Sequence, residues 1–297
     1  MILVVGEILY DIFPNYKRLG GAPFNFAFHL KHLGFPVRFV SRVGNDAEGK
    51  DILETLERFG FNLDDIQIDA ERPTGNVRVH LDENGVPNFD IMADVAYDYI
   101  KFVAEIHAPL IRTSELIYYG SLIQRSKAGF KTVREILSHT PSTIRCFYDI
   151  NLRPACFNDT VVIHSLSRAN ILKINKDERD EIKRILKYDN DRNMFFKYLM
   201  DIYPLEIISM TKGDGGSEIY TKQEFFHIGP EKISKMVDSV GAGDAYAAML
   251  VAGILRQWHP DTIIHRASLF ASQICTIEGA IPESSSFYKP FTDMIQG

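Results

Sequence analysis

The feature that most restricts the fold of this chain is the alternation of short apolar runs with longer helical patterns. The short runs are rich in β-branched and aromatic residues, and they lie at residues 2–5, 35–43, 116–119, 144–149, 171–174 and 205–210. Helical segments are predicted at residues 47–59, 127–138, 176–187, 192–202, 241–258 and 262–277. Continuous apolar runs are typical of strands buried on both faces of a parallel sheet. The alternation therefore predicts an α/β fold, a three-layer αβα domain with a mainly parallel central sheet.

One segment departs from this alternation. Residues 76–81 alternate polar and apolar side chains, Asn84-Gly85 is a hairpin signal, and residues 88–92 continue beyond it. We expect this segment, about 74–97, to form a small β lid together with residues of about 11–20, within a single domain that spans 1–297. An edge hairpin without a role in function is the alternative.

Composition excludes several classes of function. The formal net charge of -6 argues against a nucleic-acid partner or an anionic membrane. Cys146, Cys156 and Cys275 are widely spaced, so neither a disulfide framework nor a zinc site is indicated, and a reducing cytoplasm is expected. The first residues lack the basic segment of a signal peptide, and no apolar run approaches the ~20 residues of a membrane span. The sequence predicts a cytoplasmic protein with small-molecule ligands.

Two nucleotide-binding patterns fail at a residue that their chemistry requires. Residues 44–50 match G-x-x-x-x-G-K, but Asp51 follows where a phosphate loop needs a hydroxyl for magnesium. Gly241-Ala242-Gly243 supplies two glycines of a dinucleotide motif, but Tyr246 occupies the position of the third. Neither a phosphate-loop enzyme nor a dehydrogenase is predicted.

The most informative stretch is residues 238–244, Asp-Ser-Val-Gly-Ala-Gly-Asp, which leads into an apolar helix. Glycines let backbone amides converge, and the start of a helix adds unpaired N–H groups and a positive dipole end, so an anion fits there. Asp244 in the first turn has two interpretations. It can complement the helix dipole, or it can act as a base beside a bound phosphate. Phosphoryl transfer needs both an anion site and such a carboxylate.

Other polar residues follow the predicted strands. The carboxyl ends of parallel strands meet at one edge, where open α/β sheets bind ligands. Asp11 follows the first strand, and the pair Gly20-Gly21 opens a helix that contains Asn25. Later strands are followed by Gly120-Ser121, residues 151–154, Asn175, Glu178, Thr211 and Gly213. We expect these groups to line one site.

Two separated motifs resemble those of the ribokinase-like, or PfkB-type, carbohydrate kinases, and the resemblance covers essentially the whole chain. The first motif is residues 20–27, Gly-Gly-Ala-Pro-Phe-Asn-Phe-Ala, followed at the family's spacing by Gly34 and Gly44. The second is residues 238–244. Within the family the chain looks most like fructokinases, because of residues 20–23, 120–122 and 151–154.

The resemblance implies an ATP-dependent sugar kinase, with D-fructose as the first candidate substrate. It makes Asp244 the general base, and it assigns the other catalytic roles to the anion hole and the phosphate contact: Gly241, Ala242, Gly243 and Arg153. Sugar contacts would come from Asp11, Gly20, Gly21 and Asn25. The nucleotide would be met by Asn175, Glu178, Thr211 and Gly213. Mg²⁺ would be held by ATP phosphates and water near Asn175 and Glu178, without a direct protein ligand.

The resemblance leaves several points open. Met249, Ile150, Lys212 and Ile281 depart from the family's usual residues, which leaves the nucleotide pocket and the donor preference undefined. A monovalent cation such as K⁺ and a homodimer through the lid are also compatible with it. The alternative acceptors are 2-keto-3-deoxygluconate, ribose and a nucleoside. A non-catalytic regulator that binds a sugar or a nucleotide is the alternative from another class.

Overall fold

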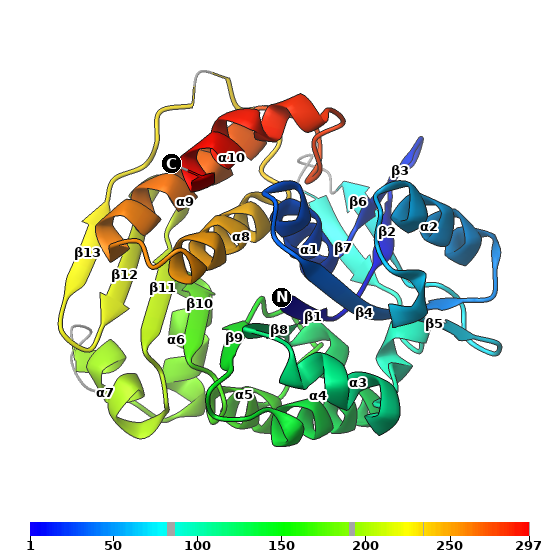
Figure 1. Cartoon of the computed structure of the whole chain (residues 1–297), viewed down its shortest axis with the longest axis horizontal. Helices are drawn as coiled ribbons and strands as arrows, with labels where there is room; N and C mark the ends of the chain where they lie inside the picture. The colour runs from blue at the N-terminus through cyan, green and yellow to red at the C-terminus, as the bar shows by residue number, and fades with distance from the viewer. Residues whose placement is uncertain (82–86, 190–193, 234, 297) are drawn as a thin grey trace.

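A nine-stranded sheet forms the centre of the protein in its computed structural model, which describes residues 1–81, 87–189, 194–233 and 235–296 (Figure 1). From one edge to the other the strands are β13 (Phe225–Ile228), β12 (Ser217–Thr221), β11 (Ile207–Thr211), β10 (Ile171–Asn175), β9 (Arg145–Asp149), β8 (Leu116–Gly120), β1 (Ile2–Val5), β4 (Val37–Gly44) and β5 (Ile66–Asp69). All pairs from β11 to β5 are parallel, whereas β12 and β13 pair antiparallel. The sheet is therefore mainly parallel, as the sequence predicts.

Strand β1 shows why a continuous apolar run suits the middle of this sheet. Successive side chains of a strand point to opposite faces. Ile2 and Val4 belong to one hydrophobic core, and Leu3 and Val5 belong to the other. All four are at most 1% exposed, so β1 stabilises both faces at once.

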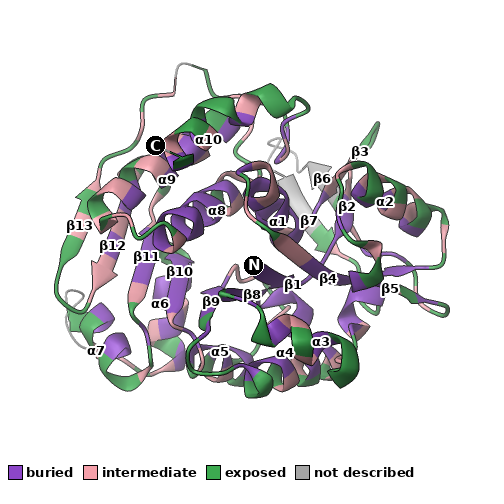
Figure 2. Cartoon of the chain, viewed as in Figure 1, coloured by how far each residue is buried: buried purple, intermediate pink, exposed green. Residues whose placement is uncertain are grey.

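Helices cover both faces of the sheet. One layer holds α1 (Ala22–His32), α8 (Ala242–Leu255), α9 (Pro260–Ile274) and α10 (Lys289–Gln296), and α2 (Ala47–Arg58) joins it near β4. The other layer holds α3 (Ala104–Arg112), α4 (Lys127–His139), α5 (Asp159–Leu166), α6 (Lys176–Ile185) and α7 (Phe195–Ile202). Short 3₁₀ turns are η1 (Leu63–Asp65), η2 (Ala96–Tyr99), η3 (Leu122–Gln124), η5 (Gly213–Gly215) and η6 (Ser285–Tyr288). Figure 2 shows that the central strands and α8 are buried, whereas the edge strands β12 and β13 are partly exposed.

A separate four-stranded sheet, here called the small sheet, lies beside the β1–β4 part of the large one (Figure 1). Its order is β3 (Lys17–Gly20), β2 (Leu9–Ile12), β6 (Asn76–Leu81) and β7 (Pro87–Ile91). β2 pairs antiparallel with β3 and parallel with β6. The Asn84-Gly85 turn expected from the sequence lies outside the described residues.

The predicted αβα fold is confirmed, and the differences concern short elements. The helices α3, α5 and α10 and the strand β5 were not predicted, and each of them is short. Strand β4 begins two residues later than the predicted strand at Phe35. No helix in the described ranges is long and apolar enough to cross a membrane.

Candidate active site

The first turn of α8 forms the centre of the candidate site. Gly241 caps this helix in the left-handed region, with φ of 77°. A Cβ on Gly241 would lie 2.3 Å from the Cβ of Ala280 and 2.5 Å from its Cα, so only glycine fits there. The amides of Ala242 and Gly243 lie in the first turn of the helix, where N–H groups lack intrahelical acceptors, and the Ala242 amide donates instead to Ser239 O at 3.3 Å. The turn therefore has the form of the anion site that the sequence predicts.

Asp244 lies within this turn and contacts α1. The Nδ2 atom of Asn25 donates a hydrogen bond to Asp244 Oδ2 at 2.8 Å. Burial raises the pKa of Asp244 to about 7, and the negative charge of Asp149 adds to the rise. The hydrogen bond from Asn25 and the charges of Lys173 and Arg153 partly offset it. A carboxyl group with this pKa can exchange a proton near neutral pH, as a general base must.

A buried ion pair lies beneath the same turn. Lys173 of β10 is 7% exposed, and its Nζ donates to Asp149 Oδ1 of β9 at 3.0 Å. Burial alone would lower the pKa of Lys173, but the charges of Asp149, Glu178 and Asp244 raise it. A Cβ on Gly243 would lie 3.6 Å from Lys173 Nζ, so this cation adjoins the anion site. Sequence analysis missed Lys173, although a lysine within the apolar run 171–174 was a signal.

The residues expected to contact a sugar lie around Asp11 and at the start of α1, where Asn25 contacts Asp244. Burial raises the pKa of Asp11 to about 6, while Arg153 and Arg18 oppose the shift. Gly20 faces Asp11, because a Cβ there would lie 2.7 Å from Asp11 Oδ2. Gly21 caps α1 with φ of 108°. These residues place the start of α1 and the end of β2 on one side of the site.

A second buried carboxyl group, that of Glu7, belongs to a loop that packs against Gly21. Glu7 follows β1 and is 3% exposed, and its Oε2 has no hydrogen-bond partner among the residues that the structure describes. Burial raises the pKa of Glu7 to about 7, Arg153 lowers it and Asp244 raises it further. A Cβ on Gly21 would lie 2.7 Å from the carbonyl oxygen of Glu7, so the two loops are in close contact. The sequence signal for Glu7 was an acidic residue two positions after a buried strand.

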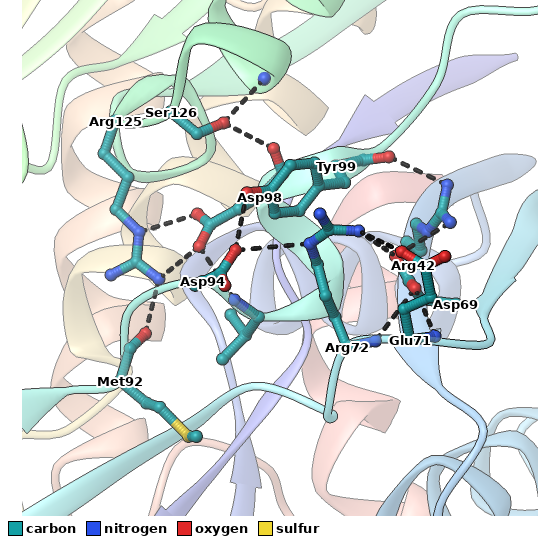
Figure 3. Close-up of polar contacts among 12 residues, drawn as sticks. Arg42, Asp69, Glu71, Arg72, Met92, Asp94, Asp98, Tyr99, Arg125 and Ser126 are labelled. Atoms are coloured by element: carbon teal, nitrogen blue, oxygen red, sulfur yellow. Dashed lines mark hydrogen bonds and ion pairs between the residues drawn. The ribbon is translucent and has the colours of Figure 1, made fainter.

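Arg153 borders a cavity of about 800 Å³ that extends from the loop after β9 to the end of β7. Its Nη1 donates only to its neighbour's carbonyl, Leu152 O at 3.4 Å, within the described part of the chain. The other arginine of this cavity, Arg125, is held in place (Figure 3). It donates from Nε and Nη2 to both carboxylate oxygens of Asp98, at 2.7 and 2.8 Å, and to the carbonyl oxygen of Met92 at 2.6 Å. Arg153 is therefore the arginine of this cavity that is available for an anionic ligand.

Figure 3 also shows how the end of β7 is fixed. Asp94 has a positive φ of 55°, which costs energy in a residue other than glycine. Tyr99 Oη donates to Asp94 Oδ1 at 2.6 Å, and Arg72 Nε donates to the same oxygen at 3.3 Å. These contacts join the two chain segments that enter and leave the β6–β7 hairpin.

A smaller cavity of about 310 Å³ adjoins the other side of the α8 turn. Its lining includes Thr211 and Gly213 after β11, together with Ala242, Gly243 and Tyr246 of α8. The sequence-predicted nucleotide residues Thr211 and Gly213 thus lie against the anion site.

Asn175 and Glu178 form a capping box at the start of α6. Asn175 Oδ1 accepts from the Glu178 amide at 2.9 Å, and Glu178 Oε2 accepts from the Asn175 amide at 2.7 Å. Glu178 Oε1 accepts from the Leu152 amide at 3.0 Å. Both oxygens of Glu178 therefore bind backbone amides, and one of these amides belongs to the loop that carries Arg153.

Comparison with known proteins agrees with this arrangement. Residues 2–286 match the model of the pfkB family carbohydrate kinases. The chain belongs to this family. Among curated relatives, fructokinase-2 of Oryza sativa subsp. japonica is 27% identical over 95% of this chain and 90% of the relative, and a fructokinase of Salmonella typhimurium is 26% identical over 92% and 91%.

Solved structures share the fold of this pfkB-family chain. An uncharacterized sugar kinase from Pyrococcus horikoshii in complex with ATP superimposes with a TM-score of 0.84 at 23% identity, covering 99% of this chain and 100% of that one. Aminoimidazole riboside kinase from Salmonella enterica, complexed with aminoimidazole riboside and an ATP analog, gives 0.81 at 19% identity, covering 100% and 99%. The relatives therefore agree on the fold while their names differ in substrate.

Proposed function

We propose that this pfkB-family chain transfers the γ-phosphoryl group of ATP to a hydroxyl of a small sugar, with D-fructose as the preferred acceptor. The observation that carries the proposal is the position of Asp244, whose pKa is raised to about 7, in the first turn of a helix with a glycine-lined N-terminus. One turn thus combines a base with an anion site. Phosphoryl transfer requires both of them together.

In the proposed mechanism Asp11 and Asn25 orient the acceptor, and Gly20 and Gly21 let it approach the backbone. Asp244 accepts the proton of the sugar hydroxyl as that oxygen forms its bond to the γ-phosphorus. The bond between this phosphorus and the β–γ bridging oxygen breaks, and ADP leaves with the electron pair. The amides of residues 241–243 stabilise the charge on the transferring group. Gly241 packs against Ala280, which helps to fix the position of these amides.

Two cations support the same charge in this proposal. Lys173 is fixed beneath Gly243 by its ion pair with Asp149. Arg153 borders the 800 Å³ cavity from the loop that Glu178 holds. Positive groups placed before the reaction act strongly in a site that excludes water.

The 310 Å³ cavity beside Thr211 and Gly213 is the proposed nucleotide site. Magnesium bound with ATP supplies charge neutralisation. Both Glu178 oxygens already accept hydrogen bonds from backbone amides. Asn175 and Glu178 therefore fit a magnesium ion that they contact through water, without direct ligation. We also propose that residues 1–297 form one domain in which the small sheet acts as a lid. A homodimer through this sheet and a K⁺ requirement stay predictions.

The choice of fructose rests on the names of curated relatives such as the Salmonella typhimurium fructokinase, at 26% identity. A nucleoside-like acceptor is the second candidate, because aminoimidazole riboside kinase shares the fold. The test is ADP release with magnesium-ATP and a panel of fructose, tagatose, ribose, 2-keto-3-deoxygluconate and adenosine. Fructose should give the highest kcat/KM. Turnover of another compound would replace the substrate and keep the kinase, whereas heat of binding without ADP formation would favour the non-catalytic regulator.

The activity should depend on pH through Asp244. Its pKa of about 7 means that the carboxylate, the form that accepts a proton, becomes populated as pH rises. We expect kcat/KM for the acceptor to rise about tenfold per pH unit below pH ~6 and to level off above pH ~8. Glu7 has a similar pKa, so Glu7→Gln is the matched control and should keep this rising limb. A profile that is flat from pH 5.5 to 8 in the wild type, with ATP saturating throughout, would contradict the assignment.

A further inference from the structure

Arg18 of β3 joins the small sheet to the loop that forms the anion site. Its Nη1 donates to Asp238 Oδ2 at 3.2 Å, and its Nη2 donates to Glu278 Oε2 at 2.9 Å. Asp238 is the first residue of the glycine-rich stretch, and Glu278 lies in the segment that packs against it. A side chain from the acceptor side of the site thus contacts both segments that build the donor side.

Asp238, the partner of Arg18, also accepts hydrogen bonds from two backbone amides. Its Oδ1 accepts from the Val240 amide at 3.0 Å, within the glycine-rich stretch. Its Oδ2, the oxygen that Arg18 contacts, also accepts from the Gly279 amide at 3.0 Å. A shift of the Asp238 carboxylate would therefore change the stretch before Gly241 and the segment before Ala280 together.

The second segment supports the anion site directly. Gly241 packs so closely on Ala280 that a Cβ would lie 2.3 Å from the Ala280 Cβ. The stem of Arg18 covers the segment from outside, because a Cβ on Gly279 would lie 3.3 Å from Arg18 Cδ. Arg18 thus contacts both segments that form the anion site. It packs against Gly279, and it is paired with Asp238.

The guanidinium is itself held in position. It lies 4.8 Å from the ring centre of Tyr16 and 5.7 Å from that of Phe13, and these two rings stack on each other at 4.5 Å. The side chains of Arg18 and Asp238 are 28% and 23% exposed, so this ion pair is partly shielded from solvent, whereas Glu278 is 77% exposed. Without Arg18, two carboxylates would face each other with no cation between them.

Arg18 also affects the acceptor side. It pairs across the strands with Asp11, and its charge is one of two that lower the pKa of Asp11 against the effect of burial. A cavity of about 450 Å³ is lined by Asp11 and Arg18 and also by Val240 and Gly279. Acceptor residues and the donor loop therefore border the same cavity, and Arg18 contacts both groups.

We propose that Arg18 is a positioning residue for phosphoryl transfer, which holds residues 238–243 in their active arrangement when the small sheet is docked. The inference rests on the proposed kinase function. It implies that the anion site is formed when the small sheet is docked and is disordered when that sheet is displaced. ATP would then be poorly activated while the small sheet is displaced, which limits transfer of the phosphoryl group to water.

The test uses Arg18→Gln in the full chain with Lys17→Gln as the matched control. Lys17 lies on the same strand, but its Nζ pairs with Asp51 of α2 at 3.2 Å, away from the glycine-rich stretch. Arg18→Gln should lower kcat at least tenfold and change KM for ATP less than threefold, and its ATP hydrolysis without acceptor should be no faster than in wild type. Arg18→Lys should recover part of kcat, and Lys17→Gln should stay within about twofold of wild type. Equal kcat values for the two glutamine variants would overturn the proposal.

A second measurement does not need the acceptor. Hydrogen exchange of peptides covering residues 237–243 and 276–281 should be faster in Arg18→Gln than in wild type and in Lys17→Gln, with ATP bound in each case. Unchanged exchange in both peptides would sink the inference even for an active kinase. If the wild type phosphorylates no sugar, the proposed function fails, while the exchange result still decides whether Arg18 orders this loop.

Discussion

Replacing Asp244 with asparagine is expected to lower kcat by about 10³-fold, because the amide cannot accept the proton of the acceptor hydroxyl. The substitution is nearly isosteric, and the new carbonyl oxygen can still accept the hydrogen bond that Asn25 donates at 2.8 Å. KM for ATP should therefore change little. The measurement is steady-state kinetics of ADP release with the best acceptor of the panel.

The stability of the same variant separates the two roles considered for Asp244. Its folded-state pKa of about 7 lies above the usual value of 3.8, so folding stability falls as pH rises through this interval. Asn cannot ionise, so Asp244→Asn should be at least as stable as wild type at pH 8. Asp261→Asn, which removes an exposed first-turn carboxylate from α9, is the control and should lose a few tenths of a kcal/mol. Near-normal kcat together with a loss like that of the control would mean that Asp244 only complements its helix.

The second large effect is expected from Gly241→Ala. The new Cβ would meet Ala280 at 2.3 Å from its Cβ and 2.5 Å from its Cα, so backbone must move. The first amides of α8 would shift with it, and we expect kcat to fall about 10²-fold, as for loss of one oxyanion donor. Kinetics and thermal unfolding of the same preparation provide the check.

Gly34→Ala is the matched control for this variant. Gly34 also has a positive φ, of 88°, but a Cβ there meets nothing within 4 Å. It should lose about 1 kcal/mol of unfolding free energy from backbone strain and keep its kcat. If Gly241→Ala matches the Gly34→Ala variant in both rate and stability, the proposed anion site is not at this turn.

Much of the fold could be predicted from the sequence because strand β1 and its neighbours are buried on both faces. That burial requires continuous apolar runs, which are visible without a structure. The short helix α5 was not visible in this way. Its eight residues make barely two turns. Its start depends on one side-chain cap, in which Asn158 Oδ1 accepts a hydrogen bond from the Val161 amide at 3.0 Å.

The site could be predicted only in part. Asp244, Asn25 and Gly241 lie in motifs whose spacing along the chain is local, so sequence patterns find them. Lys173 depends on pairing between β9 and β10, which brings Asp149 within 3.0 Å although 24 positions separate the two residues. No local pattern encodes such a contact, because it arises from the order of strands in the sheet.

The presence of two sheets has a consequence for how this protein can diverge. The four strands of the small sheet pair with one another, and they come from two stretches of chain, residues 9–20 and 76–91. The proposed nucleotide and phosphate contacts come instead from the loop after β9 and from β11, α6 and α8. With the small sheet as the proposed lid over the acceptor, substitutions in β6 and β7 would change the preferred acceptor and leave the packed layers that hold the donor undisturbed. Duplicated copies of such a gene could acquire new sugar preferences through few changes while they retain the same phosphoryl-transfer apparatus.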